Sequence, residues 1–158
     1  ATYSTRAVLL AIGRRGTPRK LDVPGEDLPK VVYSLIDAEQ YRGRKVLVVG
    51  GGDAELEAAV SIAEQPGTRV TLSYRSEAFS RVKEKNRQRV DQAAAAGRLQ
   101  VLLKSQVKTI TPDKVRLRHN ERELELANDA VIICAGGVLP TPFLKKVGIQ
   151  VETKYGTA

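Results

Sequence analysis

The sequence contains few of the side chains that carry out chemistry without a bound group. Its 158 residues include one cysteine, Cys134, and one histidine, His119. One cysteine excludes an internal disulfide, a redox pair of cysteines and a cysteine-rich metal site. One histidine argues against a histidine-based metal site or a catalytic triad. We therefore expect no metal ligands and no catalytic side chain of the chain's own, so any reaction must depend on something bound.

Long apolar runs are also missing. No apolar stretch approaches the roughly 18 residues that a membrane span needs. The stretch Ala7–Ile12 is too short for a signal peptide, and no cleavage pattern follows it. Together with the scarcity of cysteine, this predicts a cytoplasmic protein without a membrane partner.

Negative charge is in deficit, with 26 lysine and arginine residues against 18 acidic ones and a formal charge of +8. Such an excess indicates an anionic partner, which can be nucleic acid, an anionic cofactor or an acidic protein. Nucleic acid is the least favoured of these. Aromatic residues make up only 4% of the chain, tryptophan is absent, and no nucleic-acid-binding motif is present.

Apolar runs that end at glycine alternate with helical patterns along the chain. The expected strands are Arg6–Ile12, Lys45–Val49, Arg69–Tyr74, Leu99–Lys104 and Ala130–Cys134, and the expected helices are Asp53–Gln65, with Asp53 as N-cap, and Val82–Ala96. Val31–Tyr41 fits a short helix or turn, and Gln106–Leu126 alternates as an antiparallel meander does. The order predicts an α/β fold: a Rossmann-like parallel sheet with flanking helices and an antiparallel β-meander, which is a three-layer ββα sandwich.

The main chemical signal is the glycine turn Gly50-Gly51-Gly52, followed by Asp53. It follows a buried strand and opens a helix, the context that a dinucleotide-binding fingerprint requires. The first glycine allows the tight turn, and the second lets the backbone approach a pyrophosphate at the helix N-terminus. The third marked position is normally small, but here it is Glu55. The alternative interpretation is a glycine-rich turn that binds nothing.

The end of the next strand carries Tyr74-Arg75-Ser76, with Arg81 six residues beyond Arg75. A site for NAD usually has an acidic residue there to hold the ribose 2′-hydroxyl. A guanidinium instead suits a 2′-phosphate, to which a serine can add a hydrogen bond. These residues therefore predict NADPH, unless Arg75 is a solvated charge.

These motifs resemble one family. Five segments, Ala7–Gly13, Pro24–Glu26, Val46–Asp53, Tyr74–Ser76 and Cys134–Pro142, are similar to flavin-dependent pyridine nucleotide–disulfide oxidoreductases of the thioredoxin reductase-like branch, including bacillithiol disulfide reductase-like proteins. The resemblance implies the NAD(P)H-binding domain (21–140), flanked by a remnant strand and crossover of a flavin domain (1–20) and by a crossover back toward it (141–158). The flavin domain is then the partner, and NADPH passes a hydride to FAD in the parent protein.

The resemblance also assigns residues. Glu57 matches a glutamate near the nicotinamide end of the cofactor, and Ala135 and Gly136 lie in a segment that is similar to one of the family's crossovers between its two domains. The echo of Ala7–Gly13 in Ala130–Gly136 is similar to the family's two crossovers. The expected cofactor-binding set is Gly50, Gly51, Gly52, Asp53, Glu57, Tyr74, Arg75, Ser76, Arg81, Ala135 and Gly136.

Three departures from the family pattern limit the function of the chain itself. No flavin fingerprint is present, so we expect no FAD bound by this chain and no turnover by it alone. Tyr33 and Ile36 stand where thioredoxin reductases have a CxxC pair, and Glu55 replaces the small residue of the fingerprint. The alternatives are a non-catalytic module that has lost nucleotide binding and a basic nucleic-acid-binding domain. We also expect a homodimer or aggregation through the unpaired strand Arg6–Ile12.

Overall fold

A computed structural model describes residues 2–9, 18–80, 82–134, 136–137 and 139–152. The chain divides into two compact units. One comprises Arg19–Ala135, and the other combines Ala1–Pro18 with Gly136–Ala158. The first unit contains both sheets and is described first.

The centre of the Arg19–Ala135 unit is a parallel sheet with the strand order β1-β8-β2-β3-β4. Its strands are β1 (Val31–Val32), β2 (Lys45–Val49), β3 (Arg69–Ser73), β4 (Leu99–Leu102) and β8 (Ala130–Ile133). The register places Val48 of β2 between Leu72 of β3 and Ile132 of β8. Parallel neighbours need a crossover connection, which is usually a helix, and helices join β2 to β3 and β3 to β4.

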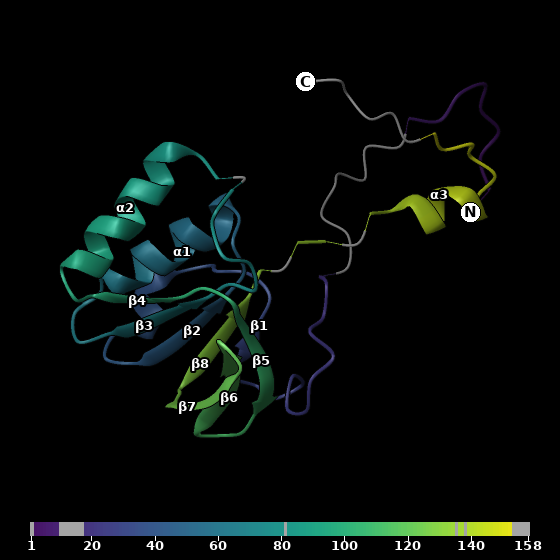
Figure 1. Cartoon of the computed structure of the whole chain (residues 1–158). Coiled ribbons are helices and arrows are strands. Elements are labelled where there is room, and N and C mark those ends of the chain that lie inside the picture. Colours follow the sequence, from purple (N-terminus) through teal and green to yellow (C-terminus); the bar gives the residue numbers. More distant parts are fainter. Residues whose placement is uncertain (1, 10–17, 81, 135, 138, 153–158) are drawn as a thin grey trace. The chain divides into compact units, whose positions relative to one another are not determined.

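Helices cover one face of this sheet and a second sheet covers the other (Figure 1). The helices are α1 (Asp53–Ala63) and α2 (Glu84–Ala95), with a 3-10 turn η1 (Ala38–Tyr41) packed near α1. The second sheet is the antiparallel meander of β5 (Ser105–Ile110), β6 (Lys114–His119) and β7 (Arg122–Ala127). The expected three-layer α/β architecture is therefore confirmed.

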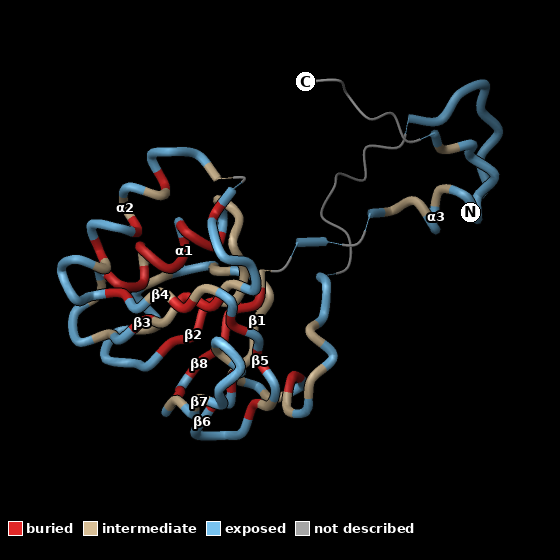
Figure 2. The backbone as a smooth tube through the Cα atoms, in the orientation of Figure 1, coloured by how far each residue is buried: buried red, intermediate tan, exposed pale blue. Residues whose placement is uncertain are grey.

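The period of two in the central strands explains why there are three layers. Val46 and Val48 of β2 join Leu56 and Ile62 of α1 in one buried cluster. The intervening residue, Leu47, belongs to a second cluster on the opposite face. Figure 2 shows the buried residues concentrated in the central strands and on the inner side of the helices. Because successive side chains of a strand point to opposite faces, an entirely apolar strand needs a covering layer on each side.

The second cluster joins the parallel sheet to the meander. Val131 and Ile133 of β8 pack with Val115 and Leu117 of β6, and all four are 1% exposed or less. The residues between them on β6, such as Arg116, are exposed. The meander therefore covers the sheet with alternate residues only, and its other face carries charge.

Two details differ from the expectation. The N-cap of α1 is Gly52, because the side chain of Asp53 accepts hydrogen bonds from α2 instead of capping its own helix. Val31–Val32 is an edge strand paired with β8, so the expected short helix is limited to Ala38–Tyr41. Both differences come from contacts with distant parts of the chain, which local pattern does not contain.

The expected strand Arg6–Ile12 is not formed in its described part. Arg6–Leu9 contain no strand, and residues 10–12 lie outside the described residues. Val8 and Leu9 are 73% and 92% exposed. A strand requires backbone partners on a neighbouring strand, and Arg6–Leu9 have none in the described part of the chain.

The second unit contains the short helix α3 (Thr141–Lys146), with Pro142 in its first turn. Pro18 and Gly137 form an isolated antiparallel bridge within this unit. Leu139, Phe143 and Val147 each leave about half of their surface exposed. This unit thus presents apolar side chains that its own fold does not cover.

The loop before β1 is held against β5 through a glycine, which gives a stability prediction. Gly25 has φ of +83°, and a side chain there would overlap the carbonyl oxygen of Ile110. The amide of Ile110 donates to the carbonyl of Pro24 at 2.9 Å. This bond holds the loop next to Ile110, so the loop cannot easily move away from the Ile110 carbonyl oxygen. We expect Gly25→Ala to lower the free energy of unfolding by about 2–5 kcal/mol, the sum of left-handed strain and overpacking.

Gly43→Ala is the matched control. Gly43 has φ of +70°, but a side chain there meets nothing within 4 Å. Gly43→Ala should therefore lower the free energy of unfolding by the left-handed strain alone, about 1–2 kcal/mol. Urea unfolding followed by circular dichroism measures both variants. Equal losses would show that Gly25 is needed for its backbone conformation alone.

Candidate dinucleotide site

The glycine turn forms the sharp connection between β2 and α1. Gly50 has φ of +140°, and its amide donates to the carbonyl of Ser73 on β3 at 3.0 Å. Gly52 is extended and opens α1. The amides of Asp53 and Ala54 donate no hydrogen bond within the described part of the chain, and Ala54 is exposed. A helix N-terminus with free amides favours an anion.

Glu55 lies over this turn. Its carboxylate accepts a hydrogen bond from the Gly52 amide at 2.8 Å, and the residue is only 7% exposed. A side chain at Gly50 would overlap the Glu55 side chain, and one at Gly52 would come within 2.7 Å of its carboxylate oxygen. Two of the three glycines are therefore required by Glu55 itself. Burial raises the pKa of Glu55, while the Gly52 and Glu55 amides oppose that rise.

Tyr74 accounts for the remaining glycine. A side chain at Gly51 would overlap the Tyr74 ring. The same ring stacks on Phe79, with centroids 5.3 Å apart and planes inclined by 13°. The aromatic pair therefore fixes the end of β3 against the glycine turn, which brings Tyr74 and Gly51 together as expected for one site.

Asp53 and Glu57 of α1 share one hydrogen-bond donor on α2. The side-chain amide of Asn86 donates to Asp53 at 2.7 Å and to Glu57 at 2.8 Å. Asp53 also accepts from the Lys83 amide at 2.9 Å, and these bonds lower the pKa of Asp53. Both carboxylates therefore hold α1 to α2. Their assignment to the cofactor stays a prediction.

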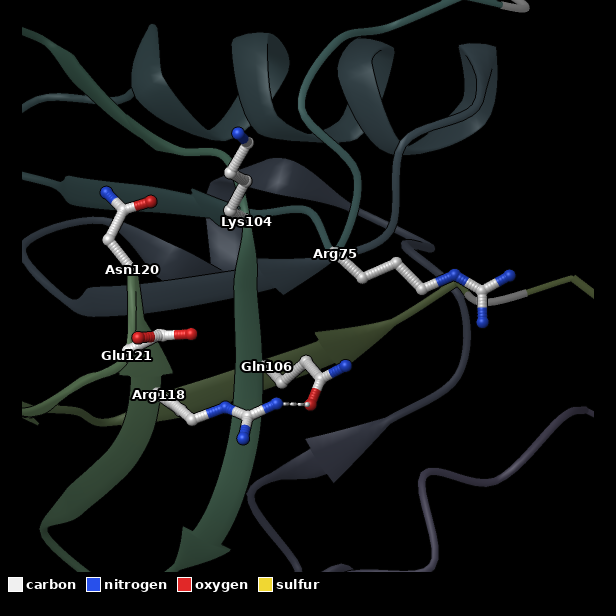
Figure 3. Close-up of a pocket in the computed structure, with 6 residues that line it drawn as sticks. All are labelled: Arg75, Lys104, Gln106, Arg118, Asn120 and Glu121. Carbon is white, nitrogen blue, oxygen red and sulfur yellow. Dashed lines mark hydrogen bonds between the residues drawn. The ribbon is translucent and has the colours of Figure 1, made fainter.

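Arg75 borders a polar cavity of about 500 Å³ at the edge where β3 and β4 end. The cavity is lined by Arg75, Lys104, Gln106, Arg118, Asn120 and Glu121. In Figure 3, Arg118 points to Gln106, and their side chains are hydrogen-bonded at 3.3 Å. The Arg75 side chain extends away from the others in the same view. The lining carries three cationic groups and the Glu121 carboxylate, and Lys104 is also paired with Glu77 at 2.9 Å. The remaining excess of positive charge makes this lining suitable for an anion.

Sequence reasoning missed most of this lining. Lys104 follows β4 just as Arg75 follows β3, and the carboxyl ends of parallel strands lie at the same edge of a sheet. That rule could have identified Lys104, whose ammonium pairs with Glu77 at 2.9 Å. Nothing local marks Arg118 or Asn120, because the return of β6 beside β5 is a tertiary event.

The remaining site candidates are spread over different parts of the chain. Ser76 adjoins Arg75, and its carbonyl accepts from the Lys104 amide at 3.0 Å. Arg81 and Ala135 lie outside the described residues. Gly136 has φ of +81° and belongs to the other unit, so it is described apart from the glycine turn.

The positions that correspond to a redox CxxC have structural partners. The Tyr33 hydroxyl donates to Glu26 at 3.0 Å, and Glu26 also accepts from the amides of Leu21 and Asp22. Ile36 is 90% exposed. Asp37 caps η1 by accepting from the Glu39 amide at 2.9 Å. This segment therefore supplies no thiol chemistry.

The described residues also bear on metal binding and membrane insertion. No group of three or more His, Cys, Asp or Glu side chains there could hold a metal ion. Among the same residues, no helix has both the length and the apolar character that crossing a membrane demands.

Comparison with known proteins places this fold. The chain matches the family "Pyridine nucleotide-disulphide oxidoreductase" over residues 1–157. It is 31% identical over 157 residues to bacilliredoxin reductase Bdr of Bacillus subtilis (strain 168), covering 98% of this chain and 48% of that protein. It is 32% identical over 161 residues to ferredoxin–NADP reductase of Thermus thermophilus, covering 95% of this chain and 47% of that protein.

Solved structures agree. The bacillithiol disulfide reductase Bdr of Staphylococcus aureus superposes with a TM-score of 0.83 at 29% identity, over 90% of this chain and 44% of that one. Thioredoxin reductase of Lactococcus lactis gives 0.74 at 25% identity, over 87% of this chain and 48% of that one. The chain thus has a thioredoxin reductase-like α/β fold and spans about half the length of the relatives it matches. It belongs to the pyridine nucleotide-disulphide oxidoreductase family, which confirms the resemblance noted in the sequence.

Cys134 provides a chemical test of the site's surroundings. Burial raises its thiol pKa to about 11, and the nearby Glu55 carboxylate adds to the rise. Since the thiolate is the nucleophile, only about 0.1% of a thiol with such a pKa is reactive at pH 8, against roughly a quarter of a free cysteine. We expect iodoacetamide to modify the folded chain at least about tenfold more slowly than the same chain in denaturant. Equal rates, measured by mass spectrometry, would contradict this environment.

Proposed function

We propose that this chain is the NAD(P)H-binding domain of a flavin-dependent oxidoreductase, with NADPH as the preferred dinucleotide. The observation that carries the proposal is the glycine turn between β2 and α1, where the amides of Asp53 and Ala54 have no partner within the described part of the chain. Membership of the family and relatives named for NADP support the same cofactor class.

The residues at the turn fit a pyrophosphate. The Asp53 and Ala54 amides are the donors that an anion at this helix end would accept from. The first turn also carries the acidic residues Asp53 and Glu55, of which Asp53 is bound to Asn86. When bound, the dinucleotide supplies a hydride. The part of this chain is to hold and orient it, because the donor chemistry belongs to the cofactor.

The cavity beside Arg75 suits the 2′-phosphate that distinguishes NADPH from NADH. Arg75 takes the position where an NAD site has a carboxylate, and Lys104 and Arg118 add positive charge to the same lining. Ser76 is the neighbouring hydroxyl. A guanidinium binds phosphate through paired, charge-assisted hydrogen bonds, so these groups favour NADPH over NADH.

A flavin-binding domain is the proposed partner. We propose that residues 1–20 and 141–158 belong to the crossovers with that domain and that residues 21–140 form the NAD(P)H-binding domain. The half-exposed apolar side chains of Leu139, Phe143 and Val147 support a covering partner. FAD would then be held by the rest of the longer protein. The proposed reaction is hydride transfer from NADPH to that flavin.

Glu55 favours a second candidate function. A buried carboxylate already accepts from the Gly52 amide at the turn. If the Glu55 carboxylate cannot move away from the turn, the chain keeps its fold but has lost nucleotide binding. The two candidates differ in one measurable property, the affinity of the chain for a dinucleotide.

The proposal predicts a nucleotide preference that depends on Arg75. We expect NADPH to bind the 158-residue chain more tightly than NADH. Arg75→Ala should weaken NADPH binding about tenfold to a hundredfold, the value of a lost charge-assisted hydrogen bond, and leave NADH nearly unchanged. Arg118→Ala should weaken NADPH less, because Arg118 is shared with Gln106. Titration calorimetry at one fixed salt concentration measures all of these affinities.

Arg116→Ala is the matched control for Arg118. Both side chains are exposed on the same face of β6, but Arg116 pairs with Glu123 and Glu125 and does not line the cavity. Its NADPH affinity should equal that of the wild type. A wild-type preference for NADH would contradict the role of Arg75, and no binding of either nucleotide would favour the second candidate.

A further inference from the structure

We propose that the Glu55 carboxylate is a built-in anion at the pyrophosphate position of the glycine turn, and that a dinucleotide binds only when this side chain is displaced or takes up a proton. The inference rests on the proposed dinucleotide function and adds a gate to that site. It makes the affinity of the chain for its cofactor a property of one side chain.

The geometry shows how far the turn is adapted to this side chain. The carboxylate accepts from the Gly52 amide at 2.8 Å, and the residue is 7% exposed. The glycines at 50 and 52 leave the space that the side chain occupies, since a Cβ at Gly52 would lie 2.7 Å from its carboxylate oxygen. Glu55 therefore uses a donor and a space that the fingerprint normally offers to phosphate.

Among the residues that the structure describes, no cation pairs with Glu55. The titratable groups that act on it or feel its charge are Asp53 on its own helix and the Cys134 thiol after β8. Tyr74, from the end of β3, faces the same turn through Gly51. In the described part of the chain, Glu55 forms no salt bridge. Among these residues, the groups that stabilise its negative charge are the backbone amides of Gly52 and Glu55.

A second anion at this turn would be opposed by the charge of Glu55. A phosphate that accepts from the Asp53 and Ala54 amides would lie beside the carboxylate that the Gly52 amide holds, and the two like charges would repel each other in a partly buried position. Moving Glu55 into solvent gives up the bond to Gly52, and protonating it removes the repulsion. Lowering the pH therefore assists binding, because burial already raises the pKa of Glu55.

The test compares Glu55→Ala and Glu55→Gln with the wild-type chain. The probe is NAD⁺, which survives mild acid and has no 2′-phosphate, a group that titrates near pH 6. Binding is measured by calorimetry at pH 8 and at pH 5.5. We expect the wild type to bind more tightly at the lower pH. Both variants should bind at least about tenfold more tightly than the wild type at pH 8 and lose most of the pH dependence.

Glu64→Gln is the control on the same helix. Glu64 caps the far end of α1 and pairs with Arg89 at 3.5 Å, so it lies away from the glycine turn. This variant should keep the affinity and the pH dependence of the wild type.

A readout without ligand checks the same gate. Because folding raises the pKa of Glu55, its contribution to stability is full below the ordinary value of 4.5 and is lost as the pH rises through the folded value. Thermal unfolding of the wild type should therefore show a loss of stability with rising pH that Glu55→Gln lacks. The same scans confirm that each variant is folded.

The outcomes separate this inference from the proposed function. If wild type and both variants bind NAD⁺ equally at each pH, the gate is wrong and the dinucleotide function stands. If only the variants bind measurably, the gate is confirmed and is closed in the wild type at the pH used. If no form binds NAD⁺ or NADPH, the proposed function is wrong and the gate falls with it.

Discussion

Strands β2 and β8 are apolar on both faces, and this two-sided burial requires the other layers of the fold. Val46 and Val48 need the helices, whereas Leu47 and Val131 need the meander. A two-layer protein would leave one of these faces in water, at roughly 25 cal/mol for each Å² of apolar surface. The helices and the meander therefore both serve to bury the two faces of these strands. Because β2 is held between them, the glycine turn that follows it has a fixed position.

The site depends on that fixed position and on how backbone donors are shared. A helix that starts directly after a buried strand directs its free amides to the carboxyl edge of the sheet. In this chain the Gly52 amide donates to Glu55, while the amides of Asp53 and Ala54 have no partner among the described residues. The fold therefore retains the features of a dinucleotide site and also contains an internal competitor. Membership of a family fixes the fold, whereas the function depends on such individual residues.

Asn86 is a second case in which side chains at expected site positions have a structural partner within the chain. It is 5% exposed and donates to both Asp53 and Glu57, two carboxylates that the resemblance assigns to the cofactor. In the structure these acids join α1 to α2. A residue at a family's site position can thus have a structural partner within the chain, and its type alone does not show which role it has.

Periodicity and turn chemistry were enough to determine the order of elements from Lys45 to Ile133, because they act within a few residues. The run Lys45–Val49 before three glycines identifies a buried parallel strand and a helix start, and the alternation of Gln106–Leu126 identifies the meander. The family resemblance rests on the same local segments. Arg75 could be placed at a strand end because a strand's length and its following turn are both readable in sequence.

Tertiary structure alone decided what surrounds those residues. The burial of Glu55 depends on the path of the turn around it, and its raised pKa depends on that burial. Arg118 lies 43 positions further along the chain than Arg75. It reaches the cavity beside Arg75 because β6 pairs with β5. The sequence by itself determined the central strands, the two long helices, the meander and the place of the glycine turn, since these follow from short-range sterics and hydrogen bonding. Which side chains converge on that turn was decided only when distant strands packed together, because burial and charge are properties of neighbours in space.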